Sequence, residues 1–167
     1  MSTQNLQIHF FIVDQGDAAL IITPSGKQIV VDGGPNLLLL EHLGKHMPFF
    51  DRTIELLVLS HPDLDHLASI PDLLKRYNIK NVLFSGVPHR SGKYQAFLDL
   101  LSQQNIDIIV ADPSTDIVMD KNIVLDVVWP PLNSFGTDNL DSNDASVAFR
   151  LLYKEESILF TGDIEEE

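Results

Sequence analysis

The chain contains no cysteine among its 167 residues. Disulfide bonds and thiolate metal sites are therefore excluded, and any metal would have to be held by imidazole and carboxylate groups. No apolar run reaches the roughly 18 residues that are needed to span a bilayer. The first residues also lack the basic and apolar regions of a secretory signal, so the sequence favours a cytoplasmic location.

Basic residues are scarce. Lysine and arginine number 11 against 24 aspartates and glutamates, which gives a net charge of −13. A surface that tracks nucleic-acid phosphates normally shows a basic footprint, and here the few basic residues are scattered. The composition favours a solvated acidic surface, part of which bound divalent cations could neutralise. The length fits one domain with a sizeable core.

The hydrophobic pattern predicts an α/β (α+β) fold. An opening antiparallel meander leads into a β-α-β-α-β alternation, and a β-hairpin closes the chain. Strands are predicted at Gln7–Val13, Ala18–Thr23, Gln28–Val31, Ile54–Leu59, Asn81–Phe84, Ile106–Val110, Ile117–Met119, Ile123–Trp129, Ala145–Tyr153 and Ser157–Phe160. Helices are predicted at 36–46, with Asn36 as the cap, and at Leu67–Tyr77 and Tyr94–Gln104.

One short segment concentrates groups that can bind metal. His61-Pro62-Asp63-Leu64-Asp65-His66 places two imidazoles and two carboxylates directly between a buried strand and a helix. Ligand sites of open α/β sheets lie at such strand ends. Two adjacent metals about 3.5–4 Å apart could share these ligands and activate a water. Helix capping would explain one or two of the acids but not the two histidines beside them.

A second strand end adds a further carboxylate. Asp163 follows the apolar strand 158–160, and Gly162 before it allows a close approach of the backbone. By itself Asp163 is most simply a turn residue. Asp32-Gly33-Gly34 is also read most simply as a turn that needs positive φ.

At these residues the sequence resembles the metallo-β-lactamase fold superfamily, and within it the hydrolase domain of ComEC-type competence proteins. The superfamily hallmark is His-x-His-x-Asp-His after a buried strand, and the form found at 61–66 is typical of the ComEC-like branch. Further matching segments follow in order along residues 7–167: Asp14-Gln15-Gly16-Asp17, Pro24-Ser25-Gly26, Asp32-Gly33-Gly34, Asn143-Asp144-Ala145-Ser146 and Thr161-Gly162-Asp163.

The resemblance implies a four-layer αββα sandwich across 1–167, with one or two divalent ions, Zn²⁺ or Mn²⁺, at one edge. It implies that Asp65, besides binding metal, is catalytic and orients the attacking water. Asp32 is a candidate for lining the site or supporting its ligands, and Asn143 lies near where other branches keep a metal-binding histidine. The implied metal ligands are His61, Asp63, Asp65, His66 and Asp163.

Three departures from the family pattern stand out. Asp14 replaces a glycine in the first turn. Asp63 replaces a histidine, which makes Mn²⁺, a harder metal, as plausible as Zn²⁺. The family also continues past Glu167 with a helix, a strand and a His-His-Gly-Ser-like segment. We therefore expect this chain to be the N-terminal portion of a longer domain, with an apolar sheet face left uncovered that favours self-association.

Other histidines are weaker candidates. His42 and His46 are four residues apart on a helix, but a metalloprotease motif would need glutamate directly after the first histidine. We interpret both as surface residues. His89 could line a substrate cleft, although an exposed loop residue is the simpler interpretation.

The leading functional prediction is a metal-dependent hydrolase acting on a phosphodiester or similar ester, in a small molecule or a nucleic acid. The alternative is a non-catalytic metal-binding or assembly module on the same fold. A di-iron redox protein would need a flavin partner, which nothing in the sequence indicates. If the chain derives from a competence protein of the membrane, it would be a soluble domain detached from it.

Overall fold

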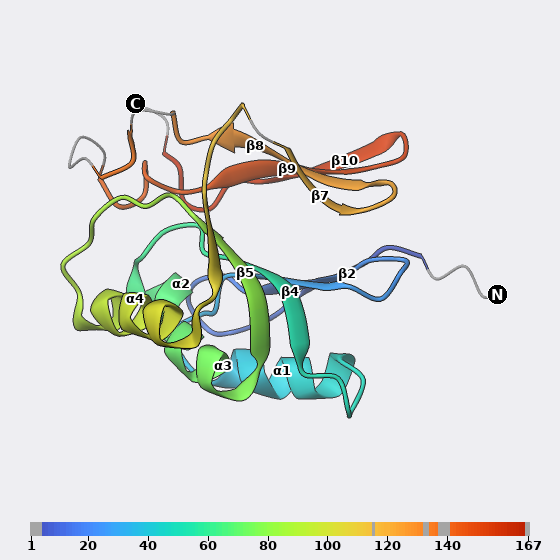
Figure 1. Cartoon of the computed structure of the whole chain (residues 1–167), viewed down its shortest axis with the longest axis horizontal. Coiled ribbons are helices and arrows are strands. Elements are labelled where there is room, and N and C mark those ends of the chain that lie inside the picture. The colour runs from blue at the N-terminus through green and yellow to red at the C-terminus, as the bar shows by residue number, and fades with distance from the viewer. Residues whose placement is uncertain (1–4, 115, 132–133, 137–140, 166–167) are drawn as a thin grey trace.

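The structure is a computed structural model, and it describes residues 5–114, 116–131, 134–136 and 141–165. Two β-sheets pack face to face, and the helices cover the outer face of the larger sheet (Figure 1). The larger sheet has the order β1 (Gln7–Phe10), β2 (Ala19–Ile22), β3 (Gln28–Val31), β4 (Thr53–Val58), β5 (Asn78–Phe84) and β6 (Asp107–Val110). The smaller sheet has the order β10 (Glu156–Phe160), β9 (Ala148–Tyr153), β8 (Ile123–Trp129) and β7 (Asp116–Asp120).

The strand pairing in the larger sheet changes from antiparallel to parallel at β3. The opening strands β1, β2 and β3 are antiparallel, whereas β3, β4, β5 and β6 are parallel. A tight turn suffices for β2 and β3, where the Thr23 amide donates to the Lys27 carbonyl at 2.9 Å. The parallel strands need helical crossovers, which is why the helices gather on this sheet.

The helices bury an apolar stripe against the sheet. α1 (Leu38–His46) buries Leu39 and Leu43 in the core. α4 (Gly92–Gln104) does the same with Phe97 and Leu101. The α1 helix begins after Leu37, and no side chain of the described residues caps it, so the prediction of Asn36 as the cap is wrong. The Asn36 side chain instead accepts from the Leu38 amide at 2.9 Å in the turn that leads into the helix.

The helix predicted at Leu67–Tyr77 is instead two helices, α2 (Leu64–Leu67) and α3 (Ile70–Arg76). Pro71 explains the break, because it has no amide hydrogen to donate back to the preceding turn. The apolar stripe expected there is still buried. The strand predicted at 145–153 likewise begins only at Ala148.

A second core lies between the sheets. Phe149 of β9 is fully buried and stacks on Phe160 of β10, with ring centroids 4.8 Å apart. The inward-facing residues of β8, Ile123, Leu125 and Val127, complete this layer.

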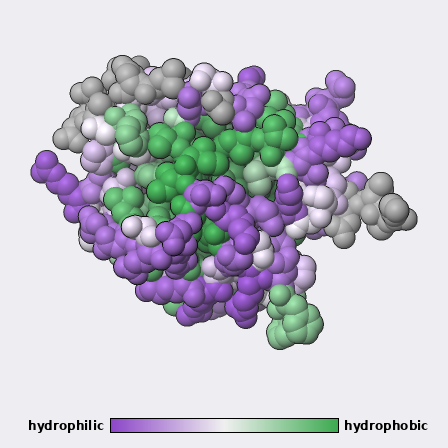
Figure 2. All heavy atoms as spheres, in the orientation of Figure 1, coloured by the Kyte–Doolittle hydropathy of each residue, from purple (hydrophilic) through white to green (hydrophobic). Residues whose placement is uncertain are grey.

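The described residues form three layers: helices, the six-stranded sheet and the four-stranded sheet. No described helix covers the outer face of the smaller sheet. Val118 and Leu159 are 69% and 57% exposed there. Hydrophobic side chains also gather across the middle of the view in Figure 2, surrounded by hydrophilic ones. None of the described helices is both long and apolar enough to cross a membrane.

Replacement of Phe149 tests the core between the sheets. Phe149→Ala should lower the free energy of unfolding by about 3–5 kcal/mol, because it leaves a cavity in a closed layer. The matched control Leu159→Ala, on the neighbouring strand but exposed, should change it by only about 0.5 kcal/mol. Urea denaturation measures both. Similar losses in the two variants would contradict this packing.

Candidate metal centre

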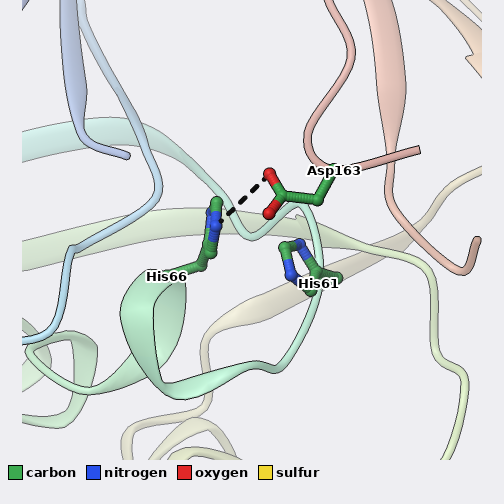
Figure 3. Close-up of side chains that lie close together, drawn as sticks. All are labelled: His61, His66 and Asp163. Atoms are coloured by element: carbon green, nitrogen blue, oxygen red, sulfur yellow. Dashed lines mark ion pairs between the residues drawn. The ribbon is translucent and has the colours of Figure 1, made fainter. Parts of the chain in front are cut away.

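Three separate segments bring His61, His66 and Asp163 together (Figure 3). His61 follows β4, His66 lies on α2, and Asp163 follows β10. One ligand atom from each lies within 4.8 Å of the others, and the His66 Nε2 is 3.5 Å from the Asp163 Oδ1. The sequence alone contains no local feature that would place Asp163 beside the 61–66 segment.

Close contact between the two sheets makes this convergence possible. The Val147 amide donates to the Ser60 carbonyl at 2.7 Å, and the Ser146 hydroxyl accepts from the Asp163 amide at 3.2 Å. Gly162 has φ +54, and a Cβ there would lie 2.8 Å from the Ser146 Oγ and 2.9 Å from the Ser60 Cβ. Only glycine therefore fits without displacement of the neighbouring strand end.

Asp32 fixes the orientation of the two histidines. Its side chain is buried, and it accepts from the Ser60 amide and the Ser60 hydroxyl, both at 2.7 Å. The Nδ1 of His66 lies 3.0 Å from the Asp32 Oδ2. Since a carboxylate only accepts, this Nδ1 donates, and the lone pair of His66 is at Nε2 whenever the ring is neutral.

The same logic applies to His61. The Ser60 hydroxyl uses its hydrogen for Asp32, so it can only accept from the His61 Nδ1, which lies 3.0 Å away. The lone pair of His61 is therefore also at Nε2. No sequence pattern singles out Ser60, because its contacts with Asp32 and His61 form only in the folded structure.

Both Nε2 atoms are buried and have no hydrogen-bond partner among the described residues. Buried polar atoms are normally paired, because an unpaired one forfeits its interaction with water. Two imidazole acceptors whose rings lie 4.2 Å apart, next to a carboxylate, are the donor set of a Zn²⁺, Mn²⁺ or iron site. The residues present thus fit a divalent metal.

The two histidines differ in charge when no metal is bound. Burial, and then the neighbouring charge of His66, lower the pKa of His61. Burial also acts to lower the pKa of His66, but the hydrogen bond to Asp32 and the charges of Asp32, Asp163 and Asp65 outweigh it and raise that pKa to about 9. At neutral pH the metal-free centre therefore carries one proton more than two neutral imidazoles would, on the Nε2 of His66.

Asp63 lies at the edge of the centre. Its Oδ2 is 3.9 Å from the His61 Nε2, and its Oδ1 accepts from the Ser142 hydroxyl. Asp63 precedes α2, yet its side chain makes no capping hydrogen bond, which removes the helix-cap interpretation of Asp63.

Asp65 and Asn143 lie outside the closest group. Asp65 is in the first turn of α2, half-buried, and packs against Gly16: a Cβ on that glycine would lie 2.0 Å from the Asp65 carbonyl oxygen. The Asn143 side chain donates to Glu165 at 2.9 Å. Their functional roles stay predictions.

The interpretation of His89 as an exposed loop residue is wrong. Its side chain is 29% exposed, and its Nε2 lies 3.7 Å from the Asp63 Oδ1. His42 and His46, by contrast, bind backbone carbonyls at 3.2 Å and 2.8 Å and do not belong to the centre. Asp14, which replaces a glycine, has φ 69 and accepts from Asn36 at 2.7 Å.

Comparison with known proteins identifies the family. The model of the metallo-beta-lactamase superfamily matches residues 12–167. The chain belongs to the metallo-beta-lactamase superfamily. Members of this superfamily are typically metal-dependent hydrolases. In sequence, the chain is 35% identical over 78 residues to the endoribonuclease YSH1 of Yarrowia lipolytica, a match that covers 44% of the chain and 9% of that protein.

Solved structures share the fold. The metallo-beta-lactamase fold protein YhfI from Bacillus subtilis has a TM-score of 0.62 at 13% identity, covering 95% of this chain and 63% of that one. The Rm3 metallo-beta-lactamase has a TM-score of 0.60 at 15% identity, covering 91% and 56%. The flavodiiron protein from Giardia intestinalis has a TM-score of 0.57 at 16% identity, covering 89% and 33%. The chain thus spans less than two thirds of each.

Replacement of Asp32 tests the electrostatics of the metal-free centre. Asp32→Asn should lower the pKa of His66 from about 9 toward its ordinary value of 6.5, because burial remains while the hydrogen bond and charge of Asp32 are lost. Imidazole NMR resonances of the metal-free chain measure it. Asp72→Asn, on the exposed side of α3, should leave it unchanged.

The sign of the stability effect follows from the raised pKa. Protonated His66 stabilises the metal-free fold fully below pH 6.5, and this stabilisation disappears as the pH rises through about 9. His61 has a lowered pKa, so its protonation below pH 6.5 opposes folding. A His66 midpoint that stays near 9 in Asp32→Asn would contradict the role of Asp32.

Proposed function

We propose that this chain is a metal-dependent hydrolase that activates water to cleave a phosphodiester or a similar ester bond. The proposed ligands of one or two divalent ions, Zn²⁺ or Mn²⁺, are His61, Asp63, Asp65, His66 and Asp163. The observation that carries the proposal is the pair of buried Nε2 atoms near the Asp163 carboxylate, neither of which has a hydrogen-bond partner in the part of the chain that the structure describes.

The chain supports such a centre in two ways. Asp32 and Ser60 hold the Nδ1 protons of both histidines, so each ring presents its Nε2 in a fixed orientation. The carboxylates of Asp63, Asp65 and Asp163 supply negative charge that a cation would balance. When bound, a divalent ion polarises an ester or phosphoryl oxygen and lowers the pKa of water, so that hydroxide becomes available near neutral pH.

Asp65 is the proposed catalytic residue. It lies in the first turn of α2, directly before His66, and its backbone packs against Gly16. A carboxylate held there can accept a proton from the attacking water and orient it. The superfamily resemblance of the 61–66 motif supports this role.

A phosphodiester is the proposed substrate class. The name of the similar protein, the endoribonuclease YSH1, supports it. The net charge of −13 argues against an extended phosphate-binding surface on this chain. A small or short phosphodiester that reaches the centre itself satisfies both observations.

The ComEC-like branch rests on the sequence motifs alone, and the family model supports the superfamily as a whole. We retain that branch as part of the proposal. The alternative function, a non-catalytic metal-binding or assembly module, predicts the same metal content without turnover, so a hydrolysis assay separates the two.

Asp65→Asn tests the proposed mechanism. It keeps the side-chain size but removes the charge, and should reduce Mn²⁺- or Zn²⁺-dependent hydrolysis of a chromogenic phosphodiester by about 100-fold or more. The matched control His42→Ala alters a histidine outside the centre and should leave turnover unchanged. Bound metal is quantified in parallel. Full activity and full metal content in Asp65→Asn would contradict the mechanism, and metal binding without turnover in the unaltered chain would favour the non-catalytic alternative.

A further inference from the structure

His89 lies in the loop between β5 and α4 and faces the candidate metal centre from the side of Asp63. It belongs to none of the motifs that carry the family resemblance. Its ring makes a perpendicular contact with Tyr94, at 6.0 Å between centroids, and the Tyr94 hydroxyl donates to the Val87 carbonyl at 3.1 Å. The histidine is therefore packed in place at the rim of the site.

Hydrogen bonds determine which nitrogen of His89 carries the proton. The Ser91 amide donates to the His89 Nδ1 at 3.3 Å. The Ser91 hydroxyl caps α4 by accepting from the Tyr94 amide, so its own hydrogen can be donated to the same Nδ1, 3.1 Å away. With Nδ1 accepting from Ser91, the proton of the neutral ring is on Nε2.

That Nε2 faces one particular oxygen of Asp63. It lies 3.7 Å from the Oδ1, the oxygen that also accepts from the Ser142 hydroxyl. The other oxygen, Oδ2, is the one that lies 3.9 Å from the His61 Nε2. The two oxygens of the carboxylate therefore have different surroundings: two donors face Oδ1, and the His61 Nε2, a proposed metal ligand, faces Oδ2.

We propose that His89, together with Ser142, is a positioning residue that holds the Oδ1 of Asp63 and leaves its Oδ2 available to a divalent ion shared with His61. This inference rests on the proposed function, in which Asp63 is a metal ligand. Outer partners of this kind fix the orientation of ligating carboxylates, and their loss costs metal affinity while every ligand remains. Asp32 has the corresponding relation to His66 on the other side of the centre.

The test is a double-mutant cycle on metal affinity, with Zn²⁺ and Mn²⁺ titrated separately into the whole chain. His89→Ala should weaken binding by about 10-fold or more. His89→Gln, which keeps a donor near the position of Nε2, should recover most of the loss. In the Asp63→Ala background, His89→Ala should have no further effect, because the residue it positions is absent.

His42→Ala is the matched control, since His42 is a histidine of α1 that binds the Ile12 carbonyl and not the centre. Thermal melting of the metal-free variants identifies any loss of folding. Unchanged affinity in His89→Ala, or an equal loss in the presence and absence of Asp63, would overturn the positioning role while leaving the metal site intact. Absence of metal binding in the unaltered chain would overturn the proposed function, and this inference with it.

Discussion

Asp32 is only 2% exposed, and its carboxylate accepts from the Ser60 amide, the Ser60 hydroxyl and the His66 Nδ1. Its backbone is held in the left-handed region, at φ 56, directly after β3. Strain of this kind persists where the surroundings fix the residue firmly. Through Ser60 the same carboxylate also orients His61, so one buried charge determines where both imidazoles present their lone pairs.

The rest of the centre depends on that arrangement. With both Nδ1 atoms committed, the two Nε2 atoms are left buried and without a hydrogen-bond partner among the described residues, near Asp163 at the junction of the two sheets. The metal-free site therefore combines a positively charged His66 with several carboxylates. A divalent cation can take the place of the His66 proton and balance the charge of these carboxylates. This is why the centre suits metal chemistry better than nucleophilic catalysis by a side chain.

Much of the fold could be predicted from the sequence because its signals are local. The β3 bounds match, the 61–66 motif follows a buried strand, and the hairpin ends at Phe160, three residues before Asp163. The predictions that failed, and the residues that were missed, depended on single residues or on contacts between distant segments. Pro71 interrupts a helix whose apolar period continues through the break. Ser60, Ser142 and His89 acquire their partners only when separate loops meet, and no spacing along the chain indicates that.

The central claim is that the Nε2 atoms of His61 and His66 bind a divalent ion while Asp32 holds the proton on the Nδ1 of His66. Calorimetric titration of the metal-free chain with Zn²⁺ at pH 7.5, in buffers of different ionisation enthalpy, tests it most directly. Because the pKa of His66 is about 9 in the metal-free chain, binding should release about one proton, and His66→Ala should abolish that release and most of the affinity. Binding without proton release, or unaltered binding in His66→Ala, would contradict the account.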